Sequence, residues 1–316
     1  MVVMDIDRRE LRTQAPGQEA GRGEPTRAPG WTPLAGNALL DRIRVTGRPR
    51  PLADPERVAR LRESLEQGLG LRPDPASVPP PSHPASIRAL LVTKDRLTRA
   101  LRGQPQSDGE IQPPTTALAC GALIDGLFQQ LITIGTIGDP MRDGLDGLGV
   151  DERQAQLVTW IENLPASERG ALAAEVVRQS ADLVTRWPRL DPAWLPRTQV
   201  PMRVGVAGGS VELSGRVDLA IGRPGLGVAS VAIVEVKSGV RRPEHRHDLH
   251  FYALLETLRS PAPPFAVATY YSRTGELDVD PVSDELLASA ARRTAAGIRA
   301  LGEQAIASSD PIGGAR

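Results

Sequence analysis

The chain has 316 residues, of which 40% are hydrophobic, enough for a sizeable core in one large domain or two modest ones. Its 38 basic residues equal its 38 acidic residues, so no whole-molecule positive field attracts nucleic acid, and any such affinity has to come from a local basic patch. A single cysteine, Cys120, excludes an intramolecular disulfide framework, a zinc ribbon and a four-cysteine iron–sulfur site within this chain.

The N-terminal region, residues 1–84, is expected to be a tail that carries one short helix. Residues 1–36 are rich in Arg, Gly, Pro and Glu and lack periodic hydrophobicity, which favours a loosely packed segment. Residues 54–69 have apolar positions at helical spacing, with Asp54 as N-cap and Pro55 at the first helical position, which predicts a helix. The Pro/Ser-rich stretch 71–84 is typical of a linker to a second domain, residues 85–316.

The first part of this second domain is expected to be helical. Residues 87–102 indicate a short apolar run and a helix, and residues 115–133 a longer apolar helix. The Gly/Asp-rich stretch 135–149 favours a loop. A helical insertion at about 150–195 is then predicted, comprising a helix at 152–163, with Asp151 and Gln154 as a capping box, and a second helix from Ser167.

After Pro196 the sequence changes to the pattern of β-strands. Apolar runs of strand length lie at 199–206, 210–221, 230–238 and 265–273, and Gly208-Gly209 predicts a tight turn between the first two. A helix is predicted at 244–259, and a final amphipathic helix begins at the N-cap Ser283. This order predicts an α/β fold with a central mixed sheet flanked by helices.

Neither a membrane span nor a signal peptide is expected. No apolar stretch reaches the roughly 18 residues that a spanning helix needs, and the N-terminus lacks the apolar segment of a signal peptide. We therefore expect a cytoplasmic protein with no membrane partner. Aromatic residues make up only 3% of the chain, so stacking platforms for bases are few, and contact with nucleic acid would be mainly to the backbone.

Three charged residues, Asp218, Glu235 and Lys237, stand at the ends of two apolar strands, where desolvation is costly unless an opposite charge or a metal compensates it. If 210–221 and 230–238 form a hairpin, facing residue numbers sum to about 453, so Asp218 lies opposite Glu235. Lys237 shares the face of Glu235 because strands have a period of two. Paired carboxylates suit a hard ion such as Mg²⁺, but spacing alone favours a salt bridge at the sheet rim.

The stretches Gly215-Arg-Val-Asp218, Glu235-Val-Lys237-Ser-Gly239 and Asp248-Leu-His-Phe-Tyr252 resemble the PD-(D/E)XK nuclease superfamily. The similarity is to its RecB/AddB-like branch, which includes CRISPR-associated exonucleases, and it runs through residues 85–305. It implies a restriction-endonuclease-like core in which Asp218, Glu235 and the carbonyl of Val236 bind Mg²⁺ or Mn²⁺ and Lys237 assists catalysis. Unlike some of these exonucleases, this chain lacks cluster cysteines, so no iron–sulfur cluster is expected.

Two positions depart from the family pattern. Where the family has Gly-x-x-x-His on a helix, this chain has Asp125, which would complete the metal shell with oxygen or else be an ordinary solvated residue. Where the family has Gln-x-x-x-Tyr, this chain has Asp248 and Tyr252 on one helix face. Both would position the substrate, although Asp248 would repel phosphate unless a neighbour or a metal neutralised it. Alternatively, Tyr252 would be a core residue whose hydroxyl is hydrogen-bonded.

A basic loop follows Lys237 and contains Arg241, Arg242 and Arg246. Beside a metal site it would contact DNA phosphates, although a solvated charge run is the alternative. The chain has no phosphate-binding loop motif, so a separate helicase or defence-system protein would supply any motor. The sequence therefore predicts a Mg²⁺-dependent deoxyribonuclease of DNA repair or anti-phage defence. The alternative is an inactive RecB-like module that binds nucleic acid or a partner protein.

Overall fold

The computed structural model describes residues 38–43, 50–69, 89–106, 114–149, 154–223 and 227–309. All of them belong to one compact unit of the chain, residues 37–316. The predicted tail 1–36, the linker 71–84 and the boundary between residues 84 and 85 lie outside the described residues. So does Asp151 of the predicted capping box.

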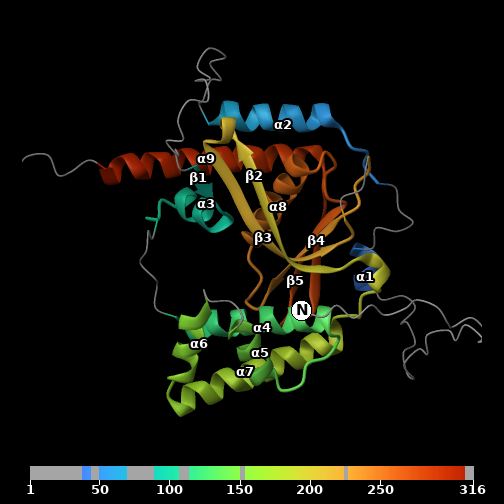
Figure 1. The fold of residues 1–316 in the computed structure, drawn as a ribbon, viewed down its shortest axis with the longest axis vertical. Coiled ribbons are helices and arrows are strands. Elements are labelled where there is room, and N and C mark those ends of the chain that lie inside the picture. Colours follow the sequence, from blue (N-terminus) through green and yellow to red (C-terminus); the bar gives the residue numbers. More distant parts are fainter. Residues whose placement is uncertain are drawn as a thin grey trace, which may run out of the picture. The chain divides into compact units, whose positions relative to one another are not determined.

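The described strands form one mixed sheet (Figure 1), which confirms the predicted α/β class. Strand β3 pairs antiparallel with β2 along one edge, and on its other edge it pairs in parallel with β1 at its start and antiparallel with β4 at its end. Strand β5 then pairs in parallel with β4 and antiparallel with β6. The strands are β1 Leu90–Val92, β2 Arg197–Val206, β3 Val211–Ile221, β4 Ala232–Lys237, β5 Ala266–Tyr271 and β6 Glu276–Pro281.

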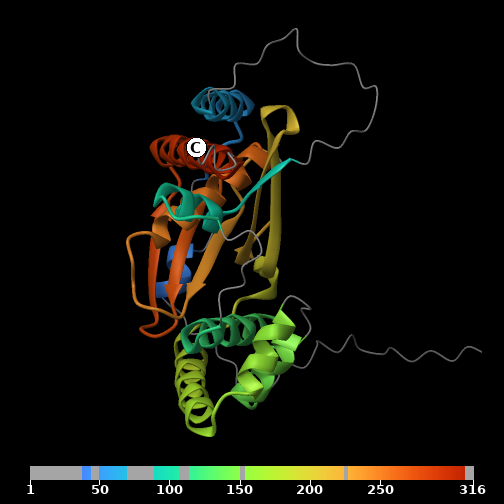
Figure 2. The same cartoon turned by 90° about the vertical axis from the view of Figure 1, so that its left-hand side faces the viewer.

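Helices cover both faces of the sheet, as Figures 1 and 2 show, and each face has its own apolar cluster. One cluster joins the sheet to α2 Pro55–Gly68, α3 Lys94–Leu101, α8 His245–Arg259 and α9 Asp284–Ser309. The other cluster joins it to α1 Ala38–Ile43, α4 Thr116–Thr133, α5 Pro140–Gly149, α6 Ala155–Glu162 and α7 Ala166–Arg186.

Helix α2, which the sequence placed in the N-terminal tail, belongs to the first of these clusters. Asp54 caps it as predicted, since its Oδ1 accepts a hydrogen bond of 2.9 Å from the amide of Arg57. Leu61 and Leu65 are buried together with residues of α9. The helix is therefore part of the core that supports the sheet.

The stretch 135–149 is a loop only as far as Asp139, because helix α5 follows it. The Oδ1 atom of Asp139 accepts hydrogen bonds of 3.0 Å from the amides of Met141 and Arg142, and Pro140 starts the helix. The prediction of a loop up to residue 149 was wrong, because it gave the glycines of this stretch more weight than the helix-capping signal at Asp139 and Pro140. One of them, Gly144, is buried in α5.

Helix α4 is long and apolar enough to cross a membrane by length and composition alone, contrary to the expectation from the sequence. One such helix is weak evidence, because the core helix of a globular protein passes the same test. Seven residues of α4 are buried, and they belong to the apolar cluster beneath the sheet. This helix carries Asp125 to the sheet.

Candidate active site

The candidate site lies where β4 leaves the edge of β3. The two strands pair only at residues 219–221 and 232–234, and every facing pair sums to 453, so the predicted register is confirmed. Asp218 and Glu235 are the next residues beyond the last pair, Leu219 and Val234. Between β1 and β4, residues 214–218 on this edge of β3 pair with no described strand.

Side chains supply hydrogen bonds along this unpaired edge. The Oδ2 atom of Asp218 accepts a bond of 2.8 Å from the amide of Val236, and the hydroxyl of Tyr252 donates one of 3.0 Å to the carbonyl of Arg216. Burial of backbone polar groups demands such partners. Asp218 therefore also links β3 to β4, and Tyr252 links α8 to β3.

Gln199 is a site residue that sequence reasoning missed. It lies at the one position where the β2–β3 ladder is interrupted, facing Asp218, and its φ is 51°. Its Nε2 lies 3.4 Å from Oδ1 of Asp218. A non-glycine residue in the left-handed region costs free energy, and such strain is often found at functional sites. No local sequence signal marks this position.

Two lysines converge on the side chain of Glu235, a residue that is only 3% exposed. Lys237 Nζ lies 3.0 Å from Oε1 of Glu235, and Lys94 Nζ donates to the same oxygen. The carboxylate of Asp248 lies 3.4 Å from Lys237 and 3.9 Å from Lys94. Two ammonium groups and two carboxylates thus alternate, so the negative charge of Asp248 is neutralised by neighbours. The second oxygen of Glu235, Oε2, is buried and has no hydrogen-bond partner.

Lys94, at the start of α3, was also missed by sequence reasoning, although the composition contains a signal for it. Of the 38 basic residues, 36 are arginine, and Lys94 and Lys237 are the only lysines in the chain. Both of them contact Glu235. A compact ammonium differs from a planar guanidinium in how it binds an oxygen, so arginine would not be an equivalent replacement at these two positions.

Burial and charge separate the three acidic groups of the site. Burial raises the pKa of Asp125 well above its usual range, and the charges of Asp218 and Glu235 raise it further. Burial and the charge of Glu235 raise the pKa of Asp218 to about 7. Burial also opposes the ionisation of Glu235, but Lys94 and Lys237 outweigh it and hold its pKa below the usual value. Two of the three carboxyl groups therefore need a proton or another cation.

These groups line a groove of about 890 Å³ at the point where β3 and β4 separate, which we call the fork. Tyr252 lines it too, with its ring 5.3 Å from Lys94 Nζ, and is almost fully buried. A Cβ at position 215 would lie 2.5 Å from Cε1 of Tyr252, so only glycine lets this ring lie against β3. Tyr252 is therefore both a buried core residue with a hydrogen-bonded hydroxyl and a residue that lines the groove. The other predicted site residues in the groove are Asp125, Asp218, Glu235, Val236, Lys237 and Arg242.

The basic loop is only partly directed at the groove. Arg241 pairs with Asp278 at 2.7 Å. Arg246 lies in the first turn of α8 and not in the loop, and it binds both carboxylate oxygens of Asp280 at 2.7 and 2.9 Å. Both aspartates lie on β6, a strand that was not predicted. Of the three arginines, the structure brings only Arg242 to the groove.

The oxygen donors of the groove suit a hard cation, although they are not pre-assembled. No group of three or more His, Cys, Asp or Glu residues within the described ranges is arranged to hold a metal ion. The orphaned Oε2 of Glu235 and the raised pKa values of Asp125 and Asp218 nevertheless show where positive charge is lacking. Carboxylate oxygens are the ligands that Mg²⁺ and Mn²⁺ prefer.

Comparison with known proteins gives little further information. No protein-family model matches the chain, and no curated protein matches it. Among solved structures, one described as "Crystal structure of SSO0001" is similar with 12% identity and a TM-score of 0.27. The similarity covers 76% of this chain and 84% of that chain. At this TM-score we draw no conclusion from it.

Proposed function

We propose that this protein is a metal-dependent nuclease that hydrolyses phosphodiester bonds of DNA. The observation that supports this most directly is the fork itself, where Asp218 and Glu235 meet at the predicted register with Lys237 beside them. The resemblance of the surrounding motifs to PD-(D/E)XK nucleases supplies the reaction class. An open groove along the fork gives a strand room to approach.

Asp218, Glu235 and the carbonyl of Val236 would hold Mg²⁺ or Mn²⁺, with Asp125 as a further oxygen donor. A bound ion of this kind lowers the pKa of a water molecule and offsets negative charge on the attacked phosphate. Lys237 would donate a hydrogen bond to a phosphate oxygen or to the attacking water. Its ammonium is charged at neutral pH, because Glu235 raises its pKa above the usual value despite burial.

The remaining residues of the groove would orient the substrate. Lys94 is a positioning residue, since it holds one oxygen of Glu235 and leaves the other, Oε2, unpartnered. Tyr252 fixes the backbone at Arg216 through its hydroxyl. The exposed Arg242 would contact the DNA backbone at the mouth of the groove. We also propose that the protein is cytoplasmic and acts together with a separate helicase or defence-system protein.

The test is cleavage of plasmid and linear DNA in the presence of Mg²⁺ or Mn²⁺, with the Lys237→Met variant as the inactive form. We expect a loss of at least about a hundredfold, the size usual for removal of a charge-stabilising group. Arg60→Met removes a mainly exposed cation on α2 and serves as the control. Equal cleavage by the Lys237 and Arg60 variants, or none by the wild type, would overturn the proposal.

A non-catalytic nucleic-acid-binding module is the second candidate, and one observation favours it. Lys94 and Lys237 already neutralise Glu235, so this carboxylate has charge partners within the chain. Calorimetric titration with Mn²⁺ separates the two candidates. Binding that Asp218→Asn abolishes supports the nuclease, whereas no Mn²⁺ binding together with intact DNA affinity supports the module.

A further inference from the structure

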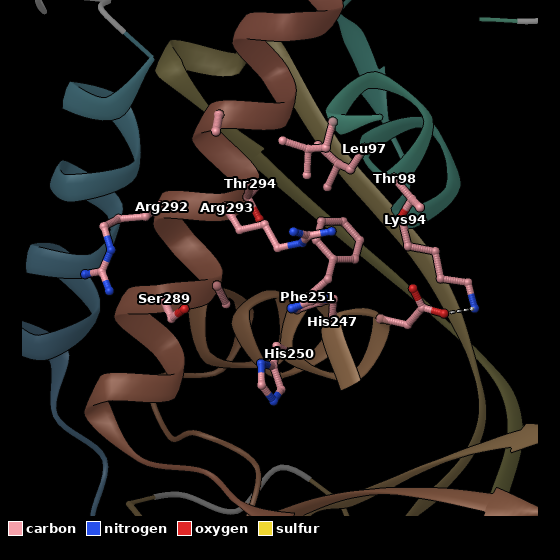
Figure 3. Close-up of a pocket in the computed structure, with 14 residues that line it drawn as sticks. Lys94, Leu97, Thr98, His247, His250, Phe251, Ser289, Arg292, Arg293 and Thr294 are labelled. Atoms are coloured by element: carbon pink, nitrogen blue, oxygen red, sulfur yellow. Dashed lines mark ion pairs between the residues drawn. The ribbon is translucent and has the colours of Figure 1, made fainter. Parts of the chain in front are cut away.

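A second pocket, of about 370 Å³, lies between α3, α8 and α9 (Figure 3). Its volume falls in the range of pockets that hold small organic ligands. It borders the groove at Lys94, which lines both. None of the proposed metal ligands lines it.

Arg293 of α9 is a half-buried cation without a counterion. It lines the pocket, and Figure 3 shows its side chain extending toward Phe251. It forms no hydrogen bond or ion pair with any residue in the described part of the chain. Asp248 is the only carboxylate among the lining residues, and Lys94 and Lys237 already engage it. A partly desolvated guanidinium is stabilised by an anion, and its planar fork suits a phosphate.

His247 supplies a second unpartnered polar group. Its Nδ1 is buried and has no hydrogen-bond partner. Burial and the nearby charge of Arg293 lower its pKa below the usual value, so at neutral pH the ring is uncharged and one nitrogen donates a hydrogen bond. The hydroxyl groups of Thr98, Ser289 and Thr294 belong to further lining residues. Several donors are therefore available, which a phosphate, with more acceptor oxygens than a carboxylate, would use more fully.

The rest of the wall is apolar. Leu97, Leu101, Phe251 and Ala290 line the pocket, and Leu97 and Phe251 belong to the buried core. An inorganic anion alone would leave this surface facing water. The combination of a cation without a counterion, several neutral donors and an apolar wall fits an anion that carries an organic group.

We infer that this pocket binds a phosphate monoester of nucleotide size, with the phosphate on Arg293 and His247 and the organic group against Phe251 and Leu97. The same chemistry is found in a free nucleoside monophosphate and in the phosphorylated end of a nucleic-acid strand. Binding here does not require that the groove hydrolyses DNA. The two proposals therefore stand or fall separately.

The test is calorimetric titration of the full chain with AMP in EDTA, so that no metal site contributes. We expect the wild type to bind AMP, and Arg293→Gln to weaken binding about tenfold or more, as expected for loss of a charged hydrogen bond. Arg299→Gln is the matched control, because Arg299 is an exposed arginine of the same helix that does not line the pocket. It should bind like the wild type.

Further titrations show whether the phosphate is recognised and whether the ligand is a free nucleotide or the end of a nucleic-acid strand. Adenosine should bind at least about tenfold more weakly than AMP if the phosphate is recognised. Competition by an oligonucleotide only when it carries a 5′-phosphate assigns the site to a strand end, and its failure assigns the site to free nucleotides. If circular dichroism shows that Arg293→Gln is unfolded, Arg293→Met, which also removes the charge, takes its place. No binding of AMP to the wild type, or equal binding by a folded Arg293 variant, overturns the inference.

Discussion

The carboxylate of Asp218 accepts a hydrogen bond of 2.8 Å from the backbone amide of Val236, so a side chain of β3 completes the hydrogen bonding of β4 where the strands part. The same aspartate is the first proposed metal ligand. Its structural and catalytic roles can be separated, because one needs an acceptor oxygen and the other needs a negative charge.

We therefore expect Asp218→Asn and Asp218→Ala to differ in stability but not in activity. Alanine leaves the buried amide of Val236 without its acceptor, which costs about 1–3 kcal/mol, whereas asparagine keeps an oxygen there. Both variants should lose cleavage activity. Urea denaturation and hydrogen exchange at the Val236 amide measure the first effect. Equal stability of the two variants would argue against the hydrogen bond.

The pair of Lys94 and Glu235 should show strong energetic coupling. Both side chains are largely buried, so removing one leaves the other with an incomplete set of charges. In a double-mutant cycle with Lys94→Met and Glu235→Gln, we expect a coupling energy of about 1–3 kcal/mol in the free energy of unfolding. Additive effects of the two substitutions would show that Lys237 alone satisfies Glu235. Lys94→Arg keeps the charge and tests the need for an ammonium.

Gly215→Ala should destabilise the protein by about 1–3 kcal/mol, because the new methyl group would overlap the buried ring of Tyr252. Gly170→Ala on α7 is the control, since its Cβ would meet no atom within 4 Å. Alanine in an exposed helix position stabilises by about 0.4–1 kcal/mol. Thermal unfolding of both variants checks the contrast. Equal shifts in both would contradict the proposed close packing.

Local patterns were sufficient to predict most helices and the register that brings Asp218 to Glu235. The cap at Asp54 and the turn at Gly208-Gly209 are encoded within a few residues. The sum of 453 follows from the length of one connection. Short-range chemistry therefore accounts for the fork.

The other parts of the site depend on contacts between distant residues. Lys94 and Glu235 are 141 residues apart, and Arg293 meets His247 only because α9 packs on α8. Strand β6 was missed because Glu276–Pro281 has only one buried residue. Asp278 and Asp280 of this strand form ion pairs with Arg241 and Arg246. The sequence alone shows these two arginines only as exposed charges.

Glu175 predicts an acid-sensitive contribution to stability. Hydrogen bonds from Arg178 and Gln179 lower its pKa from 4.5 to about 2, despite some burial. A carboxyl group with a lowered pKa stabilises the fold above its unfolded-state pKa and loses that effect as the pH falls toward its folded-state pKa. The stability difference between the wild type and Glu175→Gln should thus be constant above about pH 4.5 and shrink toward pH 2. Urea denaturation across this range measures it.

Glu168→Gln, at an exposed position near the start of the same helix, is the control for this experiment. It should follow the pH dependence of the wild type. The salt bridge between Glu175 and Arg178 is partly exposed, so we expect a modest effect. A difference that does not change between pH 2 and pH 5 would assign the effect of Glu175→Gln to packing.

The proposed metal site predicts that Asp125→His changes metal preference rather than simply abolishing activity. An imidazole nitrogen at this position favours Mn²⁺ over Mg²⁺, which prefers oxygen ligands. The ratio of cleavage rates with Mn²⁺ and Mg²⁺ should therefore rise in the variant. Asp146→His, at an exposed position on α5 outside the groove, should leave the ratio unchanged. An unchanged ratio in active Asp125→His would place Asp125 outside the metal shell and leave Asp218, Glu235 and Val236 as its ligands.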